Sequence, residues 1–384
     1  MAFILSRNAK LYVSTFDMGD GTGVAGMTAD NTFQVEVLDG FSFPSNTTVQ
    51  DVTVSEAGAA PVRGQMSFTT SIDPVEWSFS AYVRPYVDTL TSDGGTDDVV
   101  TAPEMILWGS MAAPTYATAI TDLAAAAGTS VDFGASNVHQ LQKLFLYFDL
   151  GGTWYKVSNA VVDTAEFDFG IDQIAMIAWS GKADGVLELT TDPVWTGVDR
   201  STEAVTTSGA STYTQMPVTT TAAFLTNKLS TVEVIDVDGP TTYTLALTGG
   251  NLTVTNNITF LTPESLGVIN SPLDHFTGTR GVSGSMTAYL KTGGSNDTGD
   301  LYNKLSTDVT TITQDFDIIL HVGGAIAAPI QLTFRMEHCH LVVPTINVED
   351  VLALNIDFTA LPYASEYDLE ATNELVVTYE HPAP

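Results

Sequence analysis

The sequence predicts a mainly β protein built from two tandem domains of similar fold, each a β-sandwich or split barrel with a short flanking helix and a long arm. The first observation is composition, because the 384 residues are 44% apolar and rich in Val, Thr, Ser and Gly, which favours strands. The second is a strict alternation of apolar and polar residues in segment 74–83, typical of a strand with one buried face. The third is that much of the chain is repeated.

The repeat is clearest in that alternating segment and its counterpart, 285–290. Both faces of the strand are kept, which chance matches of strand composition rarely achieve. We therefore predict a first domain at 1–196, a Ser-, Thr- and Gly-rich linker at 197–221 and a second domain at 222–384. The matching positions are Phe79 with Met286, Ala81 with Ala288 and Val83 with Leu290 on the apolar face, and Ser78 with Ser285, Ser80 with Thr287 and Tyr82 with Tyr289 on the polar face.

Further strands are predicted in pairs along the two domains. The apolar runs at 144–148 and 318–322 are almost uninterrupted, as expected of strands buried on both faces. The other predicted pairs are 2–4 with 223–225, 11–13 with 232–234, 33–37 with 243–247, and 171–179 with 348–356.

Each predicted domain also has a long polar arm, at 41–73 and at 252–280. The first arm has a tip of small residues at 56–61. Connections this long inside a compact domain are usually functional or disordered, and their presence in both domains favours a function.

A short helix is predicted after each alternating strand. In the first domain Pro103 and Glu104 suit a first helical turn, and Met105, Ile106 and Trp108 would supply the buried side. In the second domain the helix is predicted over 300–305. An insertion at 116–136 belongs to the first domain alone, where it either decorates the outside or fills a contact.

The charge balance narrows the range of partners. With 13 Lys and Arg against 45 Asp and Glu, the net charge of −32 repels nucleic acid and anionic membrane, although a salt-adapted origin would leave the same signature. No apolar run approaches the ~20 residues of a membrane span, so we expect no membrane partner. Cys339 is the single cysteine, so no intrachain disulfide forms. The first residues lack the order of a secretory signal, and we interpret them as the start of a protein made in the cytoplasm.

Candidate sites for chemistry are sparse. His338 and His340 would share one face of a strand and supply two corners of a metal site, but the further ligands that zinc needs are not evident. Segment 17–23 resembles a calcium loop without the alternating acids of an EF-hand. Neither a phosphate-binding glycine loop nor a nucleophile elbow is present. We therefore predict no catalytic, cofactor-binding or metal-binding residues, no cofactor and no enzymatic activity.

Two stretches carry a family resemblance: Glu56–Gly58 with Arg63–Phe68, and Pro74–Ser80. There the chain resembles tail tube proteins of long-tailed bacteriophages, and the order of strand, arm, strand, helix and strand is similar to theirs. The resemblance implies a structural virion protein whose sheets join edge to edge into rings, with rings stacked into a DNA conduit. A duplicated chain implies three subunits in each pseudo-hexameric ring.

The same resemblance implies the partners and the contact residues. The partners would be further copies of the chain and other tail proteins at the tube ends, while viral DNA passes through without specific binding. The protein would be made in the host cytoplasm and lie in the virion tail. Because arms reach the adjoining ring in this family, the inter-ring contact residues would be Glu56, Ala57, Gly58, Arg63, Asn256 and Asn257.

Three other classes remain open at this point. An exported or surface-displayed β-sandwich adhesion module would fit the predicted fold but would normally need an export signal. A hydrolase or metalloenzyme on a β scaffold would need a convergent site. A tail terminator, baseplate hub or sheath component would share much of the predicted architecture.

Overall fold

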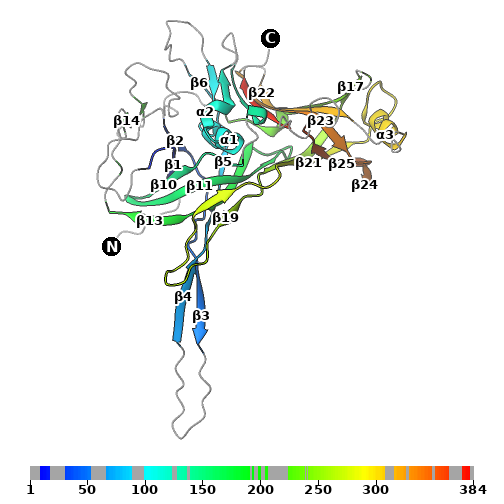
Figure 1. The fold of residues 1–384 in the computed structure, drawn as a ribbon. Coiled ribbons are helices and arrows are strands. Elements are labelled where there is room, and N and C mark those ends of the chain that lie inside the picture. Colours follow the sequence, from blue (N-terminus) through cyan, green and yellow to red (C-terminus); the bar gives the residue numbers. More distant parts are fainter. Residues whose placement is uncertain are drawn as a thin grey trace.

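In a computed structural model, the chain forms a body of β-sheets from which two arms project side by side (Figure 1). Before the predicted linker, the structure describes residues 9–17, 31–52, 66–88, 99–122, 128–135, 139–190 and 193. Within and after it, the structure describes residues 198–199, 204–205, 224–237, 239, 241–307, 315–325, 328–347, 351–362 and 374–380. We call residues 9–190 the first half and residues 224–380 the second half. Among the described residues, no helix has the length and apolarity needed to cross a bilayer.

Among its described residues, the first half is mostly strand, with two α-helices and a 3₁₀ turn at Phe133–Ala135. Its helices are α1 (Met105–Ala112) and α2 (Tyr116–Ala119). Its strands are β1 (Ala9–Ser14), β2 (Thr32–Val35), β3 (Thr47–Val52), β4 (Met66–Ile72), β5 (Val75–Tyr82), β6 (Tyr86–Asp88), β7 (Val99–Thr101), β8 (Ile120–Asp122), β9 (Gly128–Asp132), β10 (Leu144–Leu150), β11 (Thr153–Asp168), β12 (Met176–Ala183) and β13 (Gly185–Leu189).

The second half repeats this mixture. Two short strands, β14 (Val198–Asp199) and β15 (Ala204–Val205), pair with each other between the halves. The helices are a 3₁₀ turn at Asn227–Leu229 and α3 (Thr298–Thr307). The strands are β16 (Thr231–Asp236), β17 (Thr241–Thr244), β18 (Leu247–Thr255), β19 (Thr259–Leu261), β20 (Asp274–Phe276), β21 (Gly281–Tyr289), β22 (Phe316–Ala325), β23 (Ala328–Leu341), β24 (Thr345–Asn347), β25 (Ala353–Ala360) and β26 (Val376–Glu380).

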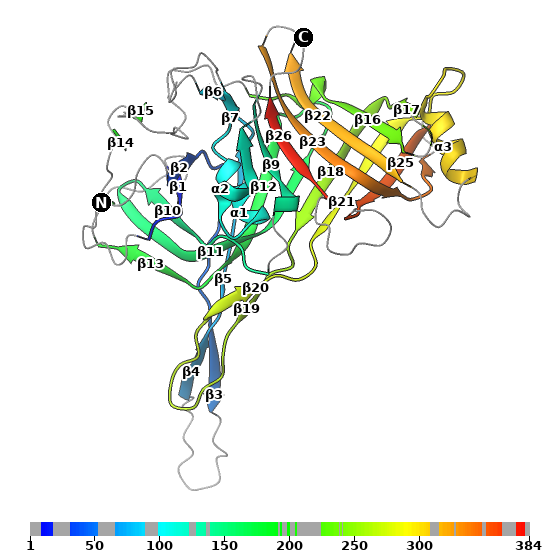
Figure 2. The same ribbon diagram turned by 45° about the horizontal axis from the view of Figure 1, so that its top comes forward.

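One antiparallel sheet runs through both halves, and we call it the continuous sheet. At its first edge, segment 37–43 is bridged to β5 through Val37 opposite Ala81 and Ser42 opposite Ser78. From there the pairing passes through β5, β12, the end of β11, β18, β21 and β25 to β24 at the other edge. A single layer therefore connects residues far apart in the sequence (Figure 2).

A second layer of strands packs over the continuous sheet. In the first half β1 lies between β2 and β10, and β10 pairs with β11. In the second half β16 lies between β17 and β22, and β22 pairs with β23. The long strands β11 and β23 belong to both layers, since each also pairs within the continuous sheet. The fold is mainly β with few helices, as predicted.

The buried faces of the two layers form one large apolar core spanning both halves. On β5 the alternation predicted from the sequence is present, because Val75, Trp77, Phe79 and Ala81 are buried while the residues between them are not. This strand therefore presents an apolar face to the core and a polar face outward.

Several strand predictions needed correction. The run at 144–148 is buried on both faces, because a small cluster around Tyr147 and Trp154 covers its second side. The run at 318–322 alternates instead, with Ile319 and His321 half-buried. The predicted strand 243–247 is split between β17 and β18, and strand β12 starts at Met176 because residues 171–174 form an exposed turn. Segment 2–4, which we paired with 223–225, lies outside the described residues.

The helix predictions are confirmed in position, with one difference in environment. Helix α1 begins directly after Glu104, and α3 contains the predicted segment 300–305. However, all eight residues of α1 are buried, so it has no exposed side. The insertion at 116–136 fills a contact: its strand β9 pairs with β26 from the end of the chain.

Candidate functional site

The first connection between the halves is the pairing of β11 with β18, which joins the strands of the first half to those of the second within the continuous sheet. Phe167 lies opposite Leu252 there, and both side chains are buried. The Phe167 ring also packs 5.2 Å from the ring of Phe334 on β23. The full register is Thr164 with Thr255, Ala165 with Val254, Glu166 with Thr253, Phe167 with Leu252 and Asp168 with Asn251.

The second connection is the C-terminal strand β26, which lies between β23 of the second half and β9 of the first. Its Tyr379 is buried, and the Tyr379 hydroxyl donates to Glu104 Oε1 at 2.9 Å while accepting from Trp108 Nε1 at 3.3 Å. Burial raises the pKa of Glu104 to about 7. These contacts attach the end of the chain to the buried helix α1.

A buried ion pair reinforces this junction. Arg280, just before β21, lies 3.1 Å from Glu374 Oε2 and also donates to the Phe133 carbonyl at 2.9 Å. Its guanidinium lies over the Phe133 ring at 5.2 Å from the centroid. Burial lowers the pKa of Arg280, and the neighbouring Glu374 opposes that shift, so the guanidinium stays charged. Because both partners are mostly shielded from water, this pair needs its geometry intact.

The arms form a second candidate site. In the first arm, β3 and β4 pair antiparallel and expose Val49, Met66 and Phe68. The second arm runs beside it, since Ile72 N–H donates to the Asn270 carbonyl at 2.8 Å and Asn270 N–H donates to the Thr70 carbonyl at 3.2 Å. The second arm exposes further apolar residues near its bend: Leu266, Val268, Ile269 and Leu273. Exposed apolar clusters of this kind mark surfaces that contact a partner.

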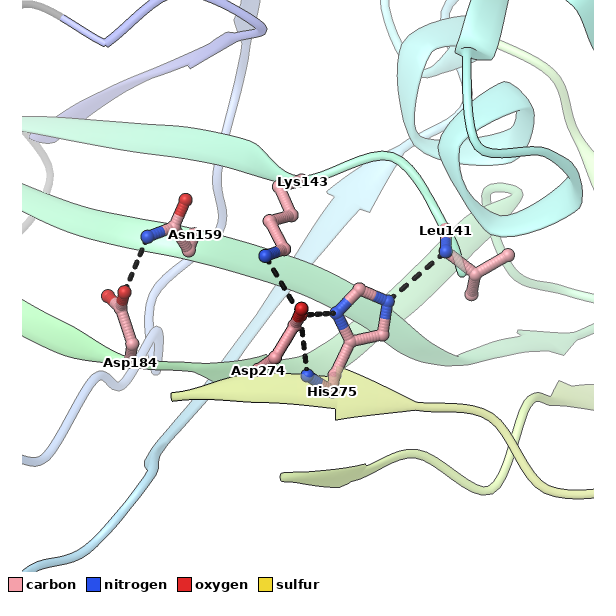
Figure 3. Close-up of polar contacts among 6 residues, drawn as sticks. All are labelled: Leu141, Lys143, Asn159, Asp184, Asp274 and His275. Atoms are coloured by element: carbon pink, nitrogen blue, oxygen red, sulfur yellow. Dashed lines mark hydrogen bonds and ion pairs between the residues drawn. The ribbon is translucent and has the colours of Figure 1, made fainter. Parts of the chain in front are cut away.

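The base of the second arm is fixed to the first half by a polar cluster (Figure 3). Lys143 Nζ lies 2.8 Å from Asp274 Oδ1, and that oxygen lies 3.3 Å from His275 Nδ1. The Leu141 N–H donates to His275 Nε2 at 3.1 Å. The Lys143 contact lowers the pKa of Asp274, whereas burial lowers the pKa of His275. Because Nε2 accepts this hydrogen bond, it carries no proton in this arrangement.

Asn159 and Asp184 lie beside this cluster in Figure 3 and form a hydrogen bond between their side chains. Burial raises the pKa of Asp184. Asn159 adopts a positive φ of 49°, which Asn tolerates better than most residues. This pair holds β11 at the point where the strand passes from one layer to the other.

Asn256 and Asn257, predicted as inter-ring contacts, lie where the second arm leaves the sheet. Asn256 is buried, and its side-chain amide donates to the Met111 carbonyl of α1 at 3.0 Å. Asn257 is exposed, and its amide donates to the Thr279 carbonyl at 2.7 Å. We therefore place Asn256 in the support of the arm, while Asn257 is at its surface. The other predicted contacts, Glu56, Ala57, Gly58 and Arg63, lie outside the described residues.

The structure does not bring His338 and His340 together at a metal site. His338 lies in a bulge with φ at 68°, and its Nδ1 is 2.7 Å from Asp315 Oδ2, while His340 is exposed. Within the described residues, no group of three His, Cys, Asp or Glu side chains is placed to hold a metal ion. Of the calcium-like segment, 18–23 lies outside the described residues, and Asp17 lies 2.8 Å from Lys156 Nζ.

A polar pocket of about 350 Å³ lies beside the first edge of the continuous sheet. Two of its charged groups already bind backbone, because Asp163 accepts from the Ile258 N–H and Lys182 donates to the Ile258 carbonyl. These two residues of the pocket therefore hold the start of the second arm in place. It is lined by Ser42, Pro44, Glu76, Trp77, Ser78, Asp163, Ser180, Gly181 and Lys182.

Sequence reasoning placed Glu104 at the start of a helix but missed its role in joining the halves, and it missed Tyr379, Arg280 and Glu374 altogether. The residues around Arg280 gave no local signal, because Thr279 and Gly281 flank it and no apolar pattern surrounds it. The partner itself cannot be read from the sequence, because 94 positions separate Arg280 from Glu374.

Comparison with known proteins agrees with the resemblance. The chain is 29% identical to the tail tube protein pb6 of Escherichia phage T5 over 399 residues, an alignment that covers 98% of this chain and 79% of that protein. Protein-family profiles give no match to the chain.

Proposed function

Because the chain is a homologue of a phage tail tube protein, we propose that it is a tail tube subunit of the virion, with further copies of itself and other tail proteins as partners. In this proposal three chains form a pseudo-hexameric ring, the rings stack into a tube, and viral DNA passes through that tube without specific binding. The subunit has a structural role and no catalytic turnover.

One observation carries the proposal: the continuous sheet has one buried apolar face and one polar face across both halves. The polar face consists mainly of small neutral residues such as Ser80, Ser285 and Asn355, with the carboxylates Glu166, Asp168 and Asp357 among them. A surface of this kind repels DNA phosphates and offers few cations to bind them. It suits the wall of a conduit through which DNA must slide.

The repeated pairing pattern supports a ring to which each chain supplies two similar sheets. Strands β5 and β12 of the first half pair through Phe79 opposite Trp179, and β21 and β25 of the second half pair through Met286 opposite Ile356. The sequence repeat matches Phe79 to Met286, so the two halves present similar sheets in tandem. A fused pair of similar domains repeats its contact around a ring and closes under rotation.

The exposed arms support stacking. Their apolar residues, such as Phe68 and Leu266, are exposed to water in the single chain, and contact with an adjoining ring would bury them. Deleting the predicted tip, residues 56–61, is expected to leave rings that no longer stack. Full-length tubes formed by the deletion variant would remove the arm from the stacking contact.

The experiment that tests the proposed function is negative-stain imaging of the concentrated protein. We expect rings and hollow tubes, with averaged end views showing six similar lobes from three chains. Particles that stay monomeric at every concentration would overturn the proposal and favour a β-sandwich adhesion module instead.

A further inference from the structure

The two edges of the continuous sheet are the starting point for an inference that rests on the proposed function. At one edge, β24 pairs with β25, and no strand among the described residues pairs with its other side. At the opposite edge, segment 37–43 is bridged to β5 alone among the described strands. An open edge presents unpaired backbone groups and is a template for another strand.

Each edge has a counterpart inside the molecule that is already paired. Ile346 of β24 lies opposite Leu354, which lies opposite Ala288. In the first half, Phe167 of β11 lies opposite Ile177, which lies opposite Ala81. Because the sequence repeat matches Ala81 to Ala288, Ile346 occupies the position of Phe167.

The first edge has its counterpart in β18. Ser42 lies opposite Ser78, and Asn251 lies opposite Ser285, the residue that the repeat matches to Ser78. Ser42 therefore occupies the position of Asn251, and Phe43 that of Leu252. Inside the chain these positions are joined, since Phe167 pairs with Leu252 and Asp168 with Asn251.

We propose that the joint between the halves is repeated between chains, so that β24 of one copy pairs antiparallel with residues 42–46 of a second copy. The internal joint fixes the register, which places Ile346 opposite Phe43 and Asn347 opposite Ser42. The remaining pairs are Thr345 with Pro44, Pro344 with Ser45 and Val343 with Asn46.

Exposure of the two edges agrees with this pairing. Ile346 is 43% exposed, whereas its counterpart Phe167 is 1% exposed in the internal joint. Phe43 is half-buried and packs 4.6 Å from the Phe148 ring, so its remaining surface is available to a partner side chain. Pairing would bury Ile346 against Phe43 as Phe167 is buried against Leu252.

The backbone hydrogen bonds also agree. Ser42 exchanges both of its backbone hydrogen bonds with Ser78, so the groups of Pro44, two residues on, face β5 and the missing N–H of Pro44 is not lost from the new joint. By the same alternation, Phe43 with Ile346 and Ser45 with Pro344 would be the hydrogen-bonded pairs of the new joint, so the missing N–H of Pro344 removes one donor from it. An edge strand tolerates one proline of this kind, and it discourages pairing with unrelated strands.

The register is testable by disulfide cross-linking, because Cys339 is buried and does not compete. Ser42 and Asn347 would form a non-hydrogen-bonded pair, with Cα atoms about 4.5 Å apart, which suits a disulfide. We expect the variant carrying S42C and N347C to yield covalent multimers up to three chains under mild oxidation. The matched control, S42C with T345C, is displaced by two residues to a diagonal position about 7–8 Å away, and it should stay monomeric on the same non-reducing gel.

Imaging the same samples separates the outcomes. Tubes without cross-links in the S42C/N347C variant, or equal cross-linking of the control pair, would overturn the register while leaving the proposed function standing. No rings or tubes from any sample, including the unmodified protein, would overturn both.

A single substitution gives a second test that does not depend on the disulfide. Ile346→Lys is expected to abolish ring formation, because it introduces a charge that the joint would bury, while the monomer keeps its circular dichroism spectrum. The control is Leu187→Lys on β13, a side chain with the same 43% exposure that lies outside the joint. Normal rings from the Ile346→Lys variant would contradict the proposal.

Discussion

Helices α1 and α3 follow strands β5 and β21, which the predicted sequence repeat matches to each other, but the two helices are stabilised in different ways. Helix α3 obeys local rules, with Asp300 in its first turn, Lys304 in its last turn and a buried side that includes Leu301 and Leu305. Helix α1 has no acidic residue in its first turn and no basic residue in its last, and every side chain is buried. Helix α1 is therefore stabilised by the packing of its side chains against other elements and not by charges at its ends.

The difference comes from what covers each helix. The Trp108 ring of α1 packs 4.7 Å from Trp179 and 6.0 Å from Phe334, which belong to different halves. Lys304 of α3 instead forms a partly exposed ion pair with Asp236 at 2.9 Å. The first helix therefore holds the two halves together, while the second covers the end of its own half. Four measurements test this difference between the two helices.

The largest effect is expected from Trp108→Ala. Removing this fully buried ring leaves a cavity between the halves, and the free energy of unfolding should fall by about 4 kcal/mol. Tyr302→Ala on the half-buried side of α3 should cost less than half as much. Denaturant unfolding of both variants checks the comparison, and equal losses would refute the assignment of α1 as the junction.

A somewhat smaller effect is expected from Glu374→Gln, which leaves the guanidinium of Arg280 without its buried partner. The loss should be about 3 kcal/mol. The matched control is Glu337→Gln, because its ion pair with Arg335 is largely exposed and should contribute below about 1 kcal/mol. The same unfolding experiment applies, and a loss below 1 kcal/mol for Glu374→Gln would show that the junction tolerates an unpaired Arg280.

The pH dependence of stability tests Glu104. Its pKa is raised from 4.5 in the unfolded chain to about 7 in the fold, so the folded state binds the extra proton between these values. Stability should therefore decrease as pH rises from 4.5 to 7, by at most about 3 kcal/mol. Glu104→Gln should remove this part of the slope, and an unchanged slope in that variant would exclude Glu104 as its origin.

The smallest effect is expected at the base of the second arm. Burial lowers the pKa of His275 below its unfolded value of 6.5. The contribution of the neutral imidazole to folding stability is therefore present above pH 6.5 and is lost as the pH falls below that value. Protonated Nε2 cannot accept the Leu141 N–H, a bond that contributes about 1 kcal/mol. Hydrogen exchange of the Leu141 amide, corrected for its intrinsic rate, should accelerate several-fold below pH 6. His275→Gln should lose that acceleration, and persistence of the acceleration would point to another group.

The sequence predicted the elements that depend on local pattern. Alternation in β5 predicted its buried face, and the residues around Glu104 predicted where α1 begins. It failed where burial depends on distant chain segments. Residues 318–322 resemble 144–148 in composition, yet a second cluster covers only the earlier strand, around Trp154.

The candidate site shows the same division. The arms were predicted from their length and polarity, and both project from the body (Figure 1). The placement of Asn256 was not predicted, because its carbonyl partner on Met111 belongs to a helix 145 positions earlier. The pairing of β26 with β9 and β23 was not predicted either, because the pattern of a five-residue strand does not indicate which strands lie beside it.

By itself, the sequence determined the β-rich character of the protein, the polar and apolar faces of its strands and its strongly acidic balance. These follow from the period of the strand and from side-chain chemistry, which act over a few residues. The tertiary structure alone decided that β11 meets β18, that β26 spans both halves and that α1 is enclosed between them. Such contacts depend on which surfaces meet when the chain folds back on itself, and the open edges at Ser42 and Asn347 are visible only once all the other strands have found their partners.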